Sequence, residues 1–491
     1  MACALKLCTA WLAIACSVAQ AGVRGLADVE EMPLTAALEG DLWQPFELMP
    51  ATPAPTPIWT GVAPASYVVS GEDYDPPPAP EAKPEAEFDP ADLPAPDAPD
   101  EPQFKLPELE TQAASQEEKK EKAWYEKMKI RGYAQFRYNR IGETNPNLRS
   151  PQGDRSIGDD QSFLLRRARM VFSGDAGEYV SYYIQPDFAS GATGPNPLHF
   201  LQIRDFYADV HLDPCKEHRL RIGQSKVPYG FENLQSSQNR LALDRNDPLN
   251  SAVVNERDLG VFYYWAPTFI RERFKHLVES GLKGSGDYGV VGLGIYNGQT
   301  ANRPELNSNQ HVVARISYPF MFANGQIFEP GLSGYTGTYT IERSAGIGGG
   351  PDFLDRRGAV SFVLYPQPWG VQGEWTNGQG PQLNAAQTDV ERSSLYGGYF
   401  QLFYKWDEFC VFGRPGTLFP FVRLQRYDGG RKHEANSPTQ RIREAEVGFE
   451  YQFSKALELT AQYTFAERTF PQAPYQQEEG SLLRLQLQWN Y

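Results

Sequence analysis

From Arg131 to the end of the chain, apolar and polar residues alternate in long segments that turn residues separate. The last segment, SLLRLQLQWNY, alternates Leu483, Leu485 and Leu487 with polar residues. Side chains of a strand point alternately to its two faces, so a period of two predicts strands with one apolar face. Several segments keep the alternation for about 10 residues or more, the length of a membrane-crossing strand, whereas soluble strands average about 5 to 6. We therefore predict an all-β fold, a transmembrane antiparallel β-barrel, rather than a soluble all-β domain.

The number of alternating segments is sixteen. An even number lets both ends of the barrel chain lie on the periplasmic side. The segments begin near Arg131, Phe163, Glu178, Phe200, Glu217, Asp258, Asp287, Asn309, Gln326, Gly358, Trp369, Arg392, Phe419, Gln440, Ala456 and Ser481. We predict a barrel of 16 strands over residues 131–491.

The links between these segments differ in length. The short links at 174–177, 213–217 and 453–456 are predicted to be periplasmic turns, and the stretch 267–286 an oversized turn at the same end. Two glycine-rich stretches, 346–350 and 378–380, are predicted to be external loops. Cys215 and Cys410 then fall in periplasmic turns too far apart on the rim to form a disulfide.

The N-terminal segment has the pattern of a secretory signal. Lys6 precedes an apolar run, and Ala19-Gln20-Ala21 is a small-x-small cleavage site, so residues 1–21 are predicted to be a signal peptide. A second interpretation makes Cys16 a lipidated cysteine, although the leucine that usually stands three residues before such a cysteine is replaced by Ala13.

Residues 22–111 carry 18 of the 39 prolines, and residues 22–118 hold 3 basic and 21 acidic residues. Such a composition cannot bury enough apolar surface to fold, so we predict a disordered acidic arm in the periplasm. It is either a spacer or an arm that reaches the cell wall or a periplasmic partner. Residues 112–130 are rich in helix formers and predict a short helix or coiled coil.

A barrel of this size leaves an aqueous lumen, so the inward residues determine what passes. These positions are rich in arginine: Arg137, Arg167, Arg169, Arg219, Arg221 and Arg315. Guanidinium groups along a narrow water column favour anions. In the alternative, the arginines pair with inward carboxylates and stiffen the wall. The candidate partners are Asp187, Asp205, Asp209 and Glu444.

The longest link in the first half of the barrel spans residues 227–258. A loop of this length is more often functional than idle. If it folds into the barrel it narrows the lumen, and the side chains it presents there are Glu232, Asn233, Arg240, Asp244 and Arg245. The alternative is a cap on the surface.

Motifs for catalysis or metal binding are absent from the sequence. It has no GxSxG, HExxH, Walker-type or paired CxxC motif, and its six histidines show no ligand spacing. The mean hydropathy of −0.50 and the lack of a long apolar run exclude a spanning helix. We expect no enzyme activity, no cofactor, no metal and no nucleic-acid partner.

Three stretches between residues 131 and 246 resemble the phosphate-selective porin O and P family: GYAQFRYNR, FLLRRARMVFSG, and RIGQSKVPYGFEN with the later ALDRN. The resemblance implies a trimeric, sixteen-stranded outer-membrane channel for anions whose third loop folds into the pore, with Arg166 and Arg167 as pore arginines. The alternation places Arg167 in the lumen and Arg166 near the rim. Asn233 stands where the phosphate-selective members carry a lysine, and Tyr133 where they carry an arginine, so a general or weakly anion-selective pore is predicted.

We therefore predict a passive outer-membrane porin for small hydrophilic solutes, anionic or neutral, embedded in outer-membrane lipid as a homotrimer. The alternative function is a structural anchor, in which a plugged barrel links the outer membrane to the envelope through the acidic arm.

Overall fold

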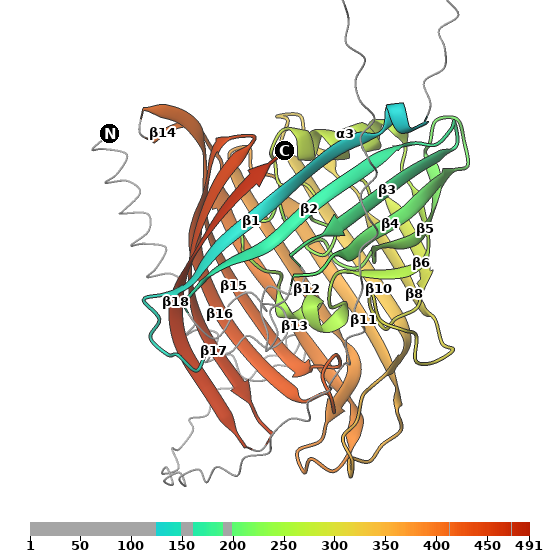
Figure 1. The fold of residues 1–491 in the computed structure, drawn as a ribbon, viewed down its shortest axis with the longest axis vertical. Coiled ribbons are helices and arrows are strands. Elements are labelled where there is room, and N and C mark those ends of the chain that lie inside the picture. Colours follow the sequence, from blue (N-terminus) through green and yellow to red (C-terminus); the bar gives the residue numbers. More distant parts are fainter. Residues whose placement is uncertain (1–123, 149–160, 190–198, 412, 473) are drawn as a thin grey trace, which may run out of the picture. The chain divides into compact units, whose positions relative to one another are not determined.

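The computed structural model describes residues 124–148, 161–189, 199–411, 413–472 and 474–491. Over these residues the chain forms one antiparallel sheet that closes into a barrel of sixteen strands (Figure 1). Its strands are β1 (Lys129–Ile141), β2 (Phe163–Asp175), β3 (Val180–Asp187), β4 (Gln202–His211), β5 (His218–Lys226), β6 (Arg257–Trp265), β7 (Val291–Tyr296), β8 (His311–Ser317), β10 (Ile327–Thr340), β11 (Asp352–Leu364), β12 (Trp369–Leu383), β13 (Val390–Tyr404), β15 (Arg414–Gly430), β16 (Thr439–Ser454), β17 (Leu457–Phe470) and β18 (Gln476–Asn490). The predicted fold class is confirmed, and every predicted segment corresponds to one of these strands.

The remaining described elements lie in links. Two short strands, β9 (Phe320–Met321) and β14 (Trp406–Val411), extend the wall by pairing with β10 and β15. The helices are η2 (Trp124–Lys127), α2 (Asp247–Ala252) and α3 (Thr268–Glu279). None of the helices in the described ranges is long and apolar enough to cross a membrane.

The barrel closes where its first strand meets its last. β1 pairs with β2 on one side and with β18 on the other. At the seam, the backbone N–H of Gly132 donates to the carbonyl of Tyr491 at 2.7 Å, and the N–H of Tyr491 donates to the carbonyl of Gly132 at 3.0 Å. These bonds leave no open sheet edge at the seam, as a wall in contact with lipid requires.

The two faces of the wall differ as the alternation predicts. Outward residues such as Phe206, Leu332 and Val360 are apolar and exposed, whereas inward residues such as Arg423 and Gln462 are polar and buried. The inward positions are buried because segments of the chain fold into the lumen. In Figure 1 α3 lies at one end of the barrel and the lime-coloured helix α2 lies inside it.

The segment 267–286, predicted to be an oversized turn, contains the twelve-residue helix α3. Ile270, Phe274 and Leu277 are spaced at four and three residues, so they share one helix face and are buried in an apolar cluster with residues of the wall. Lys283, which follows the helix, forms a buried salt bridge with Glu450 of β16. β16 is far from β6 and β7 in the strand order, so this segment crosses the barrel.

The stretch 378–380, predicted to be an external loop, lies within β12, whose ladder with β13 runs unbroken from Trp369 to Leu383. The absence of side chains at two of these residues resembles a loop in sequence, but the hydrogen-bonded neighbours keep the strand regular. The signal peptide and the acidic arm lie outside the described residues, and of 112–130 only η2 and the start of β1 are described.

Candidate functional site

The loop between β5 and β6 lies inside the barrel. Asp244 pairs with Arg137 of β1 at 3.1 Å and with Arg484 of β18 at 2.6 Å. Glu232 pairs with Arg423 of β15 at 3.0 Å. The loop therefore leaves one wall, reaches the opposite wall and returns. In the part of the chain that the structure describes, it narrows the lumen.

A turn at Gly230 directs the loop inward. Gly230 has a φ of +74°, and a Cβ there would lie 2.6 Å from Glu374 Oε1 and 2.8 Å from Leu249 Cδ2. The backbone N–H groups of Phe231 and Glu232 donate to Glu374 Oε2 at 2.6 and 3.3 Å. Only glycine adopts this conformation at such close approach without strain, so this position sets the path of the loop.

The single-turn helix α2 fixes the middle of the loop. Asn246 caps it by accepting a hydrogen bond from the Leu249 N–H at 3.1 Å. Leu249 then packs in a buried cluster with Tyr229 and Phe262. Arg357 of β11 donates to the carbonyl of Ser251 at 3.1 Å. Capping, apolar packing and a charged hydrogen bond together hold this part against the wall.

Five of the seven predicted pore arginines pair with carboxylates. The pairs are Arg137 with Asp244, Arg169 with Asp187 at 2.7 Å, Arg219 with Asp287 at 2.6 Å, Arg221 with Asp209 at 2.8 Å, and Arg315 with Glu329 at 3.2 Å. All four predicted carboxylate partners are paired: Asp187 and Asp209 with arginines of this group, Asp205 with Arg257 at 2.9 Å, and Glu444 with Arg468. Neutral pairing therefore describes most of the wall.

Arg166 and Arg167 differ from the other five. Neither has a carboxylate within ion-pair distance in the part of the chain that the structure describes, and the Nε atoms of both are buried without a hydrogen-bond partner. Arg167 donates a hydrogen bond to Gln135 Oε1 at 2.6 Å. It is repelled by the positive charges of Arg166, Arg169 and Arg240. Among the described residues, the positive charges of these two arginines therefore have no carboxylate to neutralise them.

Arg166, predicted to lie near the rim, is at an irregularity in β2. Gln135 pairs with Arg167 but Phe136 pairs with Leu165, so Arg166 is the extra residue of a β-bulge. A bulge re-aims one side chain without disturbing the rest of the strand. Arg204 of β4 occupies an equivalent bulge and also lacks a carboxylate partner among the described residues.

Four cations converge on one carboxylate where the loop returns to β6. Glu256 lies 4.0 Å from Lys226 Nζ, 3.5 Å from Arg240 and 3.7 Å from Arg245, and it forms a shorter pair with Arg257. Arg204 reaches the same place by donating to the carbonyl of Asn255 at 3.1 Å. We call this group the basic cluster: Lys226, Arg204, Arg240, Arg245 and Arg257, with the acids Glu256 and Asp205, the second of which pairs with Arg257.

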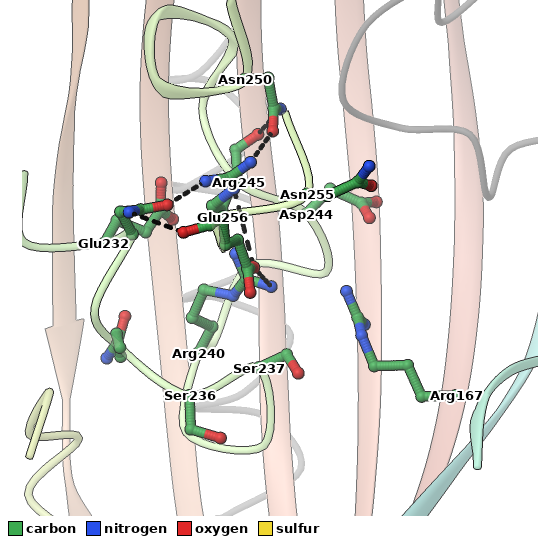
Figure 2. Close-up of polar contacts among 12 residues, drawn as sticks. Arg167, Glu232, Ser236, Ser237, Arg240, Asp244, Arg245, Asn250, Asn255 and Glu256 are labelled. Carbon is green, nitrogen blue, oxygen red and sulfur yellow. Dashed lines mark hydrogen bonds and ion pairs between the residues drawn. The ribbon is translucent and has the colours of Figure 1, made fainter. Parts of the chain in front are cut away.

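Figure 2 shows Arg240 and Arg245 beside Glu256, with Arg167 directed toward the loop from the wall. Burial by itself raises the pKa of Glu256, but Lys226, Arg257, Arg240 and Arg245 hold that pKa well below its usual range. Glu256 is therefore ionised at neutral pH, and the surrounding charge remains positive.

The predicted loop residues divide into two groups. Arg240 and Arg245 belong to the basic cluster, whereas Glu232 and Asp244 pair with arginines of the opposite wall. Asn233 is fully buried, donates to the carbonyl of Val227 at 2.8 Å and accepts from Arg245. It braces the loop and does not face the lumen.

Sequence reasoning missed Lys226, Arg204, Glu256 and Arg257. Lys226 and Arg257 end β5 and begin β6, and their register pairing brings both to the two ends of the loop. The adjacent Glu256-Arg257 at a loop end was a signal for Arg257, but a bulge such as that at Arg204 has no signature in one sequence.

The chemistry of the site is electrostatic. The described ranges hold no group of three His, Cys, Asp or Glu side chains that could bind a metal ion. Cys215 and Cys410 are free and exposed. What the site offers is a set of guanidinium and ammonium donors in excess over carboxylates, the arrangement that attracts anions in a narrow aqueous path.

A closed antiparallel barrel of sixteen strands with a charged lumen and an inward loop has the architecture of an outer-membrane porin. Residues 147–491 match the family described as phosphate-selective porin O and P, and the chain belongs to that family. The resemblance stated from three sequence stretches is thereby confirmed. Family and fold imply an outer-membrane location and a channel that passes small solutes.

Similar solved structures share little sequence with this chain. The outer-membrane channel DcaP of Acinetobacter baumannii has 13% identity and a TM-score of 0.45, over 74% of this chain and 97% of that one. OmpF of Salmonella typhi, in complex with daunomycin, has 13% identity and a TM-score of 0.46 over the same shares. An anion-selective porin from Comamonas acidovorans has 9% identity and a TM-score of 0.43, over 74% and 99%. A comparison with curated proteins gives no match.

Proposed function

We propose that this porin is a passive channel for small hydrophilic solutes that prefers anions. The observation that supports the preference is the basic cluster, in which four cations share Glu256. Arg166 and Arg167 of β2, which have no carboxylate partner among the described residues, add to it. The other five predicted pore arginines pair with carboxylates and contribute little net field. The preference therefore arises at one level of the lumen rather than along its whole length.

The preference does not extend to phosphate specificity. Asn233, which takes the place of a lysine, is buried within the loop. Tyr133, which takes the place of an arginine, is engaged with Ser237 Oγ at 2.6 Å. Neither position supplies a charged donor for a multiply charged oxyanion, so small anions and neutral solutes are the proposed substrates.

The experiment is single-channel recording of the refolded protein in a planar bilayer under a KCl gradient. Discrete steps with a reversal potential that favours chloride support the proposal. Discrete steps with a reversal potential that favours potassium overturn the anion preference but still show that the protein is a channel. A folded protein that gives no steps overturns the channel itself.

A homotrimer is the proposed assembly. β3, β7 and β8 have 8, 6 and 7 residues, fewer than the about 9 to 11 that a tilted strand needs to cross a bilayer. In a trimer, neighbouring copies would shield the side of the wall that these short strands form from lipid. Cross-linking in outer membranes tests it, with a three-copy product expected.

The proposed orientation places α3, β14 and both described chain ends in the periplasm, where the acidic arm would also lie. The anchoring function depends on residues 22–111, which are outside the described ranges. Deleting these residues tests it, because a porin keeps its conductance and an anchor loses its attachment to the envelope.

A further inference from the structure

Glu256 occupies an unusual electrostatic position. Its side chain is 7% exposed, and Lys226, Arg240, Arg245 and Arg257 all lie within 4.0 Å of its carboxylate. One of these cations would be enough to form a salt bridge with Glu256. Arg257 also pairs with Asp205 at 2.9 Å, so two carboxylates face these four cations. The remaining positive excess is held in place by the loop and the strands on either side.

The backbone fixes Glu256 in this position. Asn255 and Glu256 both have positive φ values, +65° and +72°. The N–H of Glu256 donates to the carbonyl of Val253 at 3.1 Å, and its carbonyl accepts from the N–H of Val227 at 3.1 Å. Two consecutive left-handed residues other than glycine cost free energy, and such strain persists where surrounding contacts require the geometry. The strain here directs a carboxylate into the group of cations.

The cations retain unused donors. Arg240 Nε and Nη1 and Arg204 Nε are buried without a partner among the described residues. Arg240 is 3% exposed at its side chain. Without Glu256, these donors and the ammonium of Lys226 would form a site for an anion.

We propose that Glu256 is a resident counter-anion, which fills the centre of the basic cluster so that a passing anion is attracted but not held. The inference rests on the proposed function and adds the residue that sets the strength of anion binding. Conduction requires a site that is favourable enough to enter and weak enough to leave. A solute carboxylate or a halide meets the unpartnered donors of Arg240 and Arg204 and exchanges rapidly, because the central position is already taken by an ionised carboxylate.

The ionisation of Glu256 is secure near neutral pH, since the four cations hold its pKa well below the usual range against the opposing effect of burial. Protonation therefore does not empty the central position under physiological conditions.

The test uses the variant Glu256→Gln in the full-length protein, with sulfate as the probe. Chloride current is recorded in planar bilayers while sodium sulfate is added. Loss of one negative charge among four cations strengthens anion binding, so half-block by sulfate is expected at a concentration at least about tenfold lower than in the wild type. The chloride preference in the reversal potential is also expected to rise.

Three further variants separate this mechanism from a structural effect. Glu279→Gln makes the same charge change on an exposed residue of α3 and should leave sulfate block unchanged. Glu256→Asp keeps the charge and should behave like the wild type. The double variant Glu256→Gln with Arg240→Gln restores the original charge balance and should return sulfate block toward the wild-type concentration.

Two outcomes overturn the inference. Unchanged sulfate block in Glu256→Gln shows that the residue does not limit anion binding. A larger conductance with reduced selectivity shows that Glu256 only holds the loop. A wild-type channel that prefers potassium contradicts the proposed function instead, so the two failures are distinguishable.

Discussion

Asp244 of the inward loop lies between Arg137 of β1 and Arg484 of β18, and its Oδ2 is 3.1 Å and 2.6 Å from their Nη1 atoms. β1 and β18 are the strands that meet at the seam of the barrel. One carboxylate thus ties the loop to both sides of the closure. All three side chains are nearly fully buried, so the interactions are only weakly screened by water or salt.

Replacing Asp244 by Asn should weaken both the fold and the position of the loop. Two buried arginines lose a charged partner, and breaking a buried pair on one side costs on the order of 3 kcal/mol. We expect a lower thermal unfolding temperature and a noisier open-channel current. The matched control is Asp407→Asn in the exposed pair with Lys405, which should cost less than about 1 kcal/mol. Equal effects of the two variants would contradict the anchoring of the loop by Asp244.

Replacing Arg167 by Glu should reduce the anion preference. Arg167 has no carboxylate partner in the described part of the chain, so its charge acts on the lumen, and reversing it should lower the ratio of chloride to potassium permeability by at least about twofold. The reversal potential under a KCl gradient measures this ratio. Arg356→Glu, on an exposed residue of β11, makes the same change outside the lumen. An unchanged ratio in Arg167→Glu would remove this residue from the selectivity mechanism.

Gly230→Ala should displace the turn that sends the loop inward. Alanine is strained by the positive φ at this position, and its Cβ would lie too close to Glu374 and Leu249. Gly325→Ala is the control, because Gly325 has a φ of +82° but nothing within 4 Å of the added Cβ. The backbone strain alone costs about 1 to 2 kcal/mol, and Gly230→Ala should exceed it. Thermal unfolding of both variants gives the comparison, and equal losses would show that the approach to Glu374 is not restrictive.

The contribution of Glu256 should persist at mildly acidic pH. Its pKa in the folded protein is lowered, so its charge and the stability it contributes are present above the unfolded value of about 4.3 and are lost only as pH falls through the folded value. The difference in reversal potential between the wild type and Glu256→Gln should therefore be the same at pH 8 and pH 5. A difference that disappears at pH 5 would show that Glu256 is protonated there.

The free cysteines report the orientation of the barrel. Cys215 lies in the turn between β4 and β5 and Cys410 lies in β14, both exposed at the end that carries α3. A membrane-impermeant maleimide should label them only after the outer membrane is opened. A second variant has both cysteines replaced by serine and carries Ala385→Cys in the link between β12 and β13, at the opposite end of the barrel. Its new cysteine should be labelled on intact cells. The reverse labelling would invert the proposed orientation.

The sequence predicted the barrel well because strand alternation is a local property. Each alternating segment has one apolar face, and lipid on one side with water on the other makes that pattern obligatory. The prediction failed where tertiary contacts decide the outcome. The helical pattern of Ile270, Phe274 and Leu277 was hidden in a stretch expected to be a turn, and glycines within β12 were mistaken for a loop.

The electrostatics of the site were less accessible from sequence. Inward arginines were identified, but whether each one pairs depends on neighbours across strands, as with Arg169 and Asp187. The bulges at Arg166 and Arg204 shift the direction of single side chains, which alternation alone cannot show. The basic cluster combines the ends of two strands with the loop between them, so it exists only once the loop has folded back.

The seam also bears on assembly. The loop tip is held by residues of the first and last strands, including hydrogen bonds from Gln135 to the carbonyl of Ser237 at 3.1 Å and from Gln488 to that of Gln238 at 3.3 Å. While the last strand is still unpaired, Asp244 lacks Arg484 and the carbonyl of Gln238 lacks Gln488, so the contacts that hold the tip are incomplete. The selective passage is thus completed by the same event that seals the wall, so an unfinished barrel in the membrane has no organised filter.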